Sequence, residues 1–151
     1  VELNTAMAGG LMVASHLLFA GMVMTSILLD FESYKRVPGA EEVSKTYYGA
    51  LRKARLVPQV RVLILSAIGV DAALTFREGE TTTAALSLLS TAVTFASVKI
   101  WVHPHVDRLV QSKDKSQERE HAGKIFPGHC LAAGLAIVGA AWRGYEILKQ
   151  N

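Results

Sequence analysis

The sequence is poor in the residues that build cross-links and metal clusters. Cys130 is the one cysteine among 151 residues, so the chain forms no internal disulfide and has no CxxC metal or redox site. It lies in an apolar stretch, where a cysteine packs as a small hydrophobic residue. The sequence also lacks a P-loop, a dinucleotide fingerprint, a nucleophile elbow and a paired-carboxylate motif. No catalytic class is therefore indicated by a motif.

Formal charge is missing from long parts of a chain that is half hydrophobic. Residues 5–29, 81–98 and 125–142 carry none at neutral pH, and a membrane-spanning helix needs about 20 apolar residues. A further stretch, 58–76, is interrupted by Arg61 and Asp71, of which Arg61 is near enough to one end to reach the headgroups. We therefore predict an all-α protein in which residues 1–151 form a single membrane domain, a four-transmembrane-helix bundle. The predicted spans are residues 5–29, 58–76, 81–102 and 125–142.

The basic residues are sorted between the two sides of this predicted bundle. The connections around residues 30–61 and 99–124 hold 13 of the 16 lysines and arginines, and the rest are Arg77, Arg143 and Lys149. Basic residues concentrate on the cytosolic or matrix side of a membrane. We therefore expect loops 30–57 and 103–124 on that side and both termini on the opposite side.

The connections between the spans differ in length and character. The short link 77–80 joins only antiparallel neighbours, so the second and third spans are predicted to form a hairpin. In the first long loop, residues 41–55 are typical of an amphipathic helix lying at the membrane interface, with Tyr47, Tyr48 and Leu51 against lipid headgroups or a partner. Residues 111–124 are predicted to be a polar helix or loop in solvent.

Small residues recur at every fourth position of the last span, a spacing that places them on one face of a helix. Such a face lets two backbones approach closely in lipid. It indicates either tight packing inside the bundle or a helix-docking surface for another subunit. The residues of this ladder are Gly128, Ala132, Ala136, Ala140 and Gly144.

Ionisable groups at membrane depth are costly and therefore candidates for function. His16 lies near the middle of the first span, and Asp71 lies towards the outer end of the second. Their depths differ by roughly 9 Å at 1.5 Å per residue. They are either a proton-handling or ligand-binding pair, or a neutral histidine and a protonated or water-exposed aspartate, each satisfied separately inside the bundle. With His129, they are the catalytic candidates.

Three histidines fall near one end of the predicted bundle. His103, His105 and His129 are candidate ligands for a metal or haem, because neutral imidazole is a common ligand. The spacing of His103 and His105 does not place both on one helical face, and Pro104 breaks the regularity there. We therefore predict no metal and no cofactor, and we expect bound lipids.

Four short features lie in or beside the predicted spans: His16-Leu17-Leu18-Phe19-Ala20-Gly21, Pro58, Trp101-Val102-His103-Pro104, and Phe126 with His129. In these features the chain resembles a broad group of small four-helix membrane proteins that includes fungal anthrone oxygenases. The resemblance implies a membrane oxygenase or oxidoreductase acting on a lipophilic substrate, with His16, His103 and His129 as its site. Family members often carry a tryptophan before the histidine of the last span and an arginine just after it, and residues 125–132 here contain neither.

Our leading prediction is a non-catalytic accessory subunit of a larger membrane complex in an organellar inner membrane, such as a respiratory-chain or ATP synthase assembly. Val1 stands where a Met is expected, so either a preceding segment is removed on targeting or the sequence is the ordered part of a longer one. The expected partners are other membrane subunits and lipid. Nucleic acid is not expected, because the basic residues flank the spans. The alternatives are the small oxidoreductase and a free-standing carrier or stress-related membrane protein.

Overall fold

The computed structural model describes residues 4–54 and 56–150 and is all-α, with no strand in those ranges. Asn4 begins the first helix by accepting a hydrogen bond from the Met7 N–H through its side chain, at 2.9 Å, as helix-capping residues do. The elements are α1 (Thr5–Tyr34), α2 (Ala40–Lys53), α3 (Leu56–Arg77), α4 (Thr81–Ser97), the π-helical segment η1 (Val98–Val102), α5 (His103–Gln111) and α6 (Lys115–Gln150).

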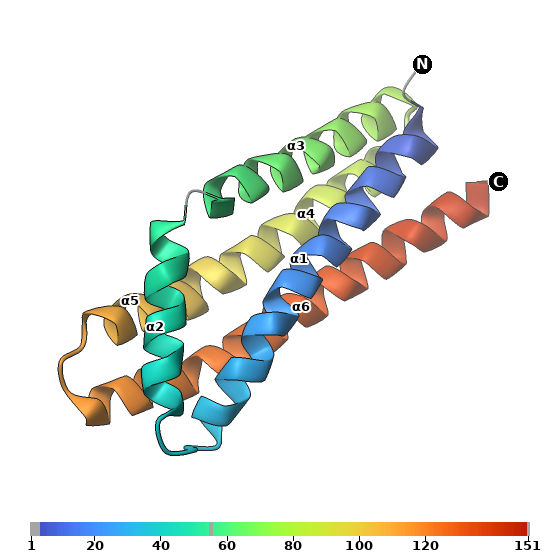
Figure 1. Cartoon of the computed structure of the whole chain (residues 1–151). Helices are drawn as coiled ribbons and strands as arrows, with labels where there is room; N and C mark the ends of the chain where they lie inside the picture. Colours follow the sequence, from blue (N-terminus) through green and yellow to red (C-terminus); the bar gives the residue numbers. More distant parts are fainter. Residues whose placement is uncertain (1–3, 55, 151) are drawn as a thin grey trace.

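The chain is an integral membrane protein built as a bundle of long apolar helices. Within residues 4–54 and 56–150, four helical runs have the length and composition to cross a membrane: α1, α3, the run from α4 through α5, and α6. Both termini lie at one end of the bundle, and the α1–α2 and α5–α6 connections lie at the other, which we call the loop end (Figure 1). The predicted all-α fold is therefore confirmed.

Two of the predicted spans are longer in the structure than their apolar stretches. The helical run that begins at Thr81 continues through Pro104 to Gln111. Because proline has no N–H for the carbonyl one turn earlier, the wider π-helical turn of η1 directly precedes it. Helix α6 begins at Lys115, ten residues before the predicted span. Our prediction that residues 111–124 lie in solvent is wrong for Ala122, which is buried.

Helix α2 forms in the first loop, as predicted, but its apolar face packs on the protein itself. It crosses the loop end of the bundle at an angle to the long helices (Figure 1). Tyr48 is buried in a cluster with residues of α5 and α6, and Tyr47 and Leu51 pack against that cluster. The prediction that these side chains meet headgroups or a partner is therefore wrong for Tyr48, because α5 and the extended start of α6 supply its apolar cover, whereas Tyr47 and Leu51 remain half-buried. Ion pairs also fix α2: Glu41–Arg119, Lys45–Glu118 and Arg52–Asp107.

The small-residue ladder lies largely inside the bundle. Ala132, Ala136 and Ala140 are buried, and α1 is the helix that α6 contacts most extensively. At Gly128, an added Cβ would lie 2.7 Å from Trp101 Cδ1. At half-buried Gly144, by contrast, an added Cβ meets no atom within 4 Å. The alternative of a docking surface for another subunit is wrong for the three alanines, because the chain's own helices cover them.

Candidate functional site

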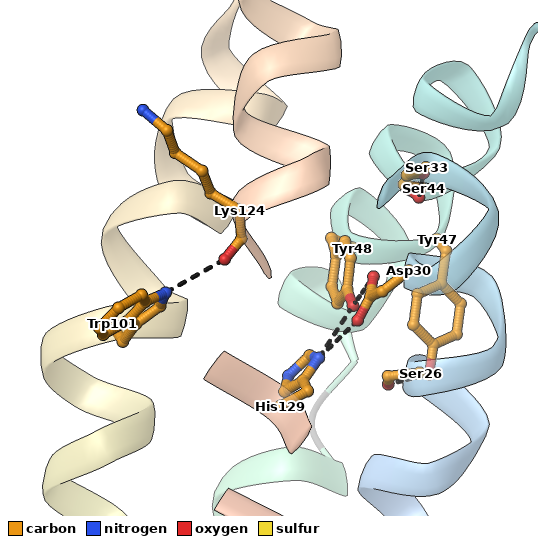
Figure 2. Close-up of polar contacts among 9 residues, drawn as sticks. All are labelled: Ser26, Asp30, Ser33, Ser44, Tyr47, Tyr48, Trp101, Lys124 and His129. Atoms are coloured by element: carbon orange, nitrogen blue, oxygen red, sulfur yellow. Dashed lines mark hydrogen bonds and ion pairs between the residues drawn. The ribbon is translucent and has the colours of Figure 1, made fainter. Parts of the chain in front are cut away.

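A buried carboxylate joins three helices near the loop end of the bundle. Asp30 of α1 is fully buried. Its Oδ1 accepts a hydrogen bond from the Tyr48 hydroxyl of α2 at 2.6 Å, and its Oδ2 lies 2.6 Å from His129 Nδ1 of α6. Figure 2 shows the tyrosine and histidine converging on this carboxylate. We call these three residues the Asp30 cluster.

The Asp30 carboxylate fixes the protonation of both its partners. A carboxylate only accepts hydrogen bonds, so the Nδ1 of His129 carries a proton and the Nε2 is available as a lone pair or a second donor. Burial, reinforced by the negative charge of Asp30, raises the pKa of Tyr48 well above its usual range. Tyr48 therefore stays a neutral phenol that donates its proton. The Nε2 of His129 has no hydrogen-bond partner within the described residues, and the histidine side chain is 8% exposed.

Neighbouring polar contacts hold the helices that carry the Asp30 cluster. Ser26 and Ser33 of α1 bond to Tyr47 and Ser44 of α2, at 3.1 and 2.8 Å. On the other side of the cluster, Trp101 Nε1 of η1 donates to a backbone carbonyl of α6 at 3.1 Å (Figure 2). These contacts hold α2 and η1 against the bundle. The helices that surround the His129 ring are therefore fixed relative to one another.

A buried ion pair lies deeper in the bundle, towards the termini. Arg143 of α6 and Asp71 of α3 are both fully buried, with Arg143 Nη2 2.6 Å from Asp71 Oδ1 and Nε 3.1 Å from Oδ2. Arg143 Nη2 also donates to Thr75 Oγ1, and Ser87 Oγ donates to Asp71 Oδ2. Arg143 Nη1 is buried without a hydrogen-bond partner among the described residues. We call Asp71, Arg143 and these hydroxyls the Arg143 cluster.

His16 and Asp71 do not form the predicted pair. His16 Nδ1 donates to the Met12 carbonyl at 3.1 Å, and its Nε2 lies 3.4 Å from Thr91 Oγ1. Asp71 is bound by Arg143 instead. The alternative prediction is correct in that each is satisfied separately, but it expected Asp71 to be protonated or exposed to water. A cavity of about 10 Å³ beside His16 has room for about one water molecule.

The three histidines proposed as metal ligands do not converge. His103 Nε2 lies 2.9 Å from Arg61 Nη2, and His105 Nδ1 lies 3.3 Å from His121 Nδ1. His129 is bound to Asp30. No group of three or more histidine, cysteine, aspartate or glutamate side chains suited to a metal occurs in the described ranges. The ligand set His103, His105 and His129 is therefore wrong.

Sequence reasoning missed Asp30, Arg143 and His121. Asp30 follows the first charge-free stretch directly, and Arg143 follows the last one. The charge pattern alone therefore counts Arg143 among the basic residues of the outer side, and Asp30 falls in the predicted loop 30–57. A charge at the edge of an apolar stretch signals either a surface position or a buried pair, and only the position of a partner on another helix distinguishes the two.

The fold and the two buried clusters define the chain as a small α-helical membrane protein, with four candidate spans in the part that the structure describes. The comparisons add no closer assignment, since no protein-family model, curated protein or solved structure matches the chain. The function proposed below therefore rests on the sequence and geometry of this chain alone.

Proposed function

We propose that the chain is a non-catalytic accessory subunit of a larger membrane protein complex. The observation that carries this proposal is that the two buried carboxylates inside the bundle are each bound to a basic side chain of α6. Arg143 is held by Asp71, and His129 by Asp30. Buried polar pairs of this kind fix how helices associate in a protein core, a structural role.

The space around the buried groups supports the same proposal. Sites that bind small lipophilic molecules are typically cavities of about 300–1,000 Å³. The cavity beside His16 measures about 10 Å³, too small for such a substrate. The exterior, by contrast, offers broad apolar surface for lipid and for other membrane subunits, including Leu63, Phe76 and Val138, each at least 60% exposed.

The charge distribution supports an orientation and a location. The loop end carries most of the basic residues, so it faces the matrix or cytosol and both termini face the opposite compartment. An organellar inner membrane, which holds large multi-subunit assemblies of the respiratory-chain and ATP synthase type, is the location we propose.

Native electrophoresis of the endogenous chain in mild detergent tests this proposal. We expect it to migrate within an assembly several times larger than itself, and to be unstable when it is produced alone. Migration as a stable free monomer from its native membrane would overturn the subunit proposal. If the chain does migrate in a larger assembly, mass spectrometry of the co-migrating chains would identify the complex.

A second candidate function, a small membrane oxidoreductase, is favoured by the geometry of His129. A histidine whose Nδ1 is held by a buried carboxylate and whose Nε2 is free is the arrangement used by general bases and by metal ligands. The purified chain would then convert a lipophilic probe such as an anthrone. His129→Gln would abolish turnover while assembly persisted, whereas His105→Gln, a histidine outside the Asp30 cluster, would not. Equal rates in all three proteins would exclude His129 as the base.

A further inference from the structure

A cleft of about 370 Å³ opens at the loop end, apart from the Asp30 and Arg143 clusters. Its lining comes from the C-terminal end of α1 with the residues that follow it, and from the first turns of α6. Ser33, Tyr34 and Arg36 line one side, and Ser116, Arg119 and Glu120 line the other. Apart from Gly123, the residues that line the cleft carry charged or hydroxyl-bearing side chains, and the cleft sits beside the end of a membrane-spanning helix.

The charges around the cleft leave one cation without a counterion. Arg119 Nη2 binds Glu41 Oε1 at 3.1 Å, and Glu120 binds Lys124. Each carboxylate therefore has its own cation. Arg36 makes no ion pair with any described residue, and it lines the cleft. An arginine guanidinium is suited to bidentate recognition of phosphate oxygens.

The backbone at Arg36 is one that favours glycine. Helix α1 ends with hydrogen bonds from the Arg36 N–H to the Ser33 carbonyl and from the Val37 N–H to the Glu32 carbonyl, at 3.1 and 3.0 Å. This pattern requires a left-handed residue after the cap, and Arg36 has φ of 60°. An arginine there costs more than a glycine.

An exposed aromatic surface adjoins the cleft. Tyr34, which lines the cleft, lies 5.0 Å from the Phe126 ring, and Phe31 lies 5.5 Å from the same ring. Phe31 and Tyr34 are 42% and 52% exposed. Aromatic side chains at a membrane interface lie at the level of the headgroups and the first part of the acyl chains.

We propose that this cleft binds the phosphate headgroup of an anionic phospholipid, with Arg36 and Arg119 facing the phosphate and the acyl chains along Phe31, Tyr34 and Phe126. The combination of a cationic cleft and an adjoining apolar surface fits a lipid better than a soluble anion. The loop end is also the basic end, where anionic lipid is attracted. The lipid site does not depend on whether the chain is a subunit or an enzyme.

Lipid binding by the purified full chain tests the site, with phosphatidylglycerol and phosphatidylcholine added to detergent micelles and bound lipid counted by native mass spectrometry. We expect phosphatidylglycerol to bind more tightly, and Arg36→Gln to weaken it by about fivefold to tenfold, the loss of one charge-assisted contact. Lys113→Gln is the matched control. It removes a positive charge from an exposed residue of the α5–α6 connection, at the same end of the bundle but outside the cleft lining, and we expect a change of less than about twofold.

Arg36→Gly separates lipid binding from a structural role. It relieves the left-handed strain, so the chain should unfold at the same or a higher temperature while phosphatidylglycerol binding falls as in Arg36→Gln. Equal losses for Arg36→Gln and Lys113→Gln would mean that only general charge attracts the lipid, which would overturn the site. Displacement of the lipid by equimolar glycerol phosphate would likewise overturn it, in favour of a soluble phosphate ligand.

Discussion

At the scale of single residues, the interior of this bundle is defined by charges that neutralise one another. The Arg143 guanidinium makes contacts to both Asp71 oxygens and to Thr75. Neither residue is exposed at all, so the pair has no access to water. Removing one partner from such a pair costs more than removing both, because the remaining charge is left buried and unpaired.

Asp71→Asn is therefore expected to destabilise the chain by about 3–5 kcal/mol. The double variant Asp71→Asn with Arg143→Met should recover a large part of that loss, since it removes the unpaired guanidinium. Thermal unfolding in detergent, followed by helical circular dichroism, measures both. Arg77→Met, at an exposed position on α3, is the control and should change stability little. A double variant no more stable than Asp71→Asn would contradict this account.

At the scale of the helices, the contact between α1 and α6 organises the fold. The Asp30–His129 pair joins the two helices towards the loop end, and Gly9 contacts Arg143 and Ile147 towards the termini. A Cβ on Gly9 would lie 2.7 Å from Ile147 Cδ1 and 2.9 Å from Arg143 Nη2. The absent side chain is therefore what lets Arg143 pass over α1 to reach Asp71.

Gly9→Ala is expected to destabilise the chain by about 1–3 kcal/mol, the usual cost of overpacking. The adjacent Gly10→Ala is the matched control, because nothing lies within 4 Å of its added Cβ. It should be neutral or stabilise α1 by up to about 1 kcal/mol, the gain from replacing a glycine within a helix. Urea or thermal unfolding of the two variants side by side measures the contrast. Similar losses at both positions would show that Gly9 does not mediate the close approach.

The small-residue ladder on α6 gives a second prediction for the same contact. Ala136→Leu should cost about 1–3 kcal/mol by forcing helices apart, since Ala136 is fully buried. Ala133 is no suitable control because it is only 3% exposed, whereas the same change at exposed Ala141 should leave stability unchanged. The yield and unfolding temperature of the purified monomer report the difference. Loss of partner binding by a stably folded Ala136→Leu variant would instead revive the docking interpretation.

At the scale of the whole molecule, the chain is an up-and-down bundle with all its long connections at one end (Figure 1). This arrangement matches the charge asymmetry in the sequence, since the loop end carries Lys45, Arg52 and Arg119 among other basic residues. The topology follows from an even number of crossings, which places both termini on one side.

Accessibility labelling tests that topology. In a Cys130→Ser background, a single cysteine replacing Lys113, in the α5–α6 connection, should react only from the matrix or cytosolic side. A cysteine replacing Lys149, near the end of α6, should react only from the opposite side. A membrane-impermeant maleimide applied to oriented vesicles before and after lysis distinguishes the two. If both positions reacted from the same side, one predicted span would not cross the membrane.

The sequence by itself determined the number and approximate position of the crossing helices. A charge-free stretch such as residues 5–29 or 125–142 is a local property, and the cost of placing a charge in lipid makes it decisive without knowledge of neighbours. The amphipathic helix at residues 41–55 was also found locally, from its composition, and the structure places it at Ala40–Lys53. What that helix packs against was not found in this way.

Only the tertiary structure decided which polar residues meet. Asp71 and Arg143 are 72 residues apart in sequence, and Asp30 and His129 are 99 apart. Each partner alone has the appearance of a surface charge or an isolated polar residue. The pairing depends on how α6 lies against α1 and α3. The early start of α6 contributes to the cover of Tyr48. The hydropathy pattern does not encode which polar residues pair. The rotation and register of helices in lipid are set by side-chain packing and by hydrogen bonds between the helices.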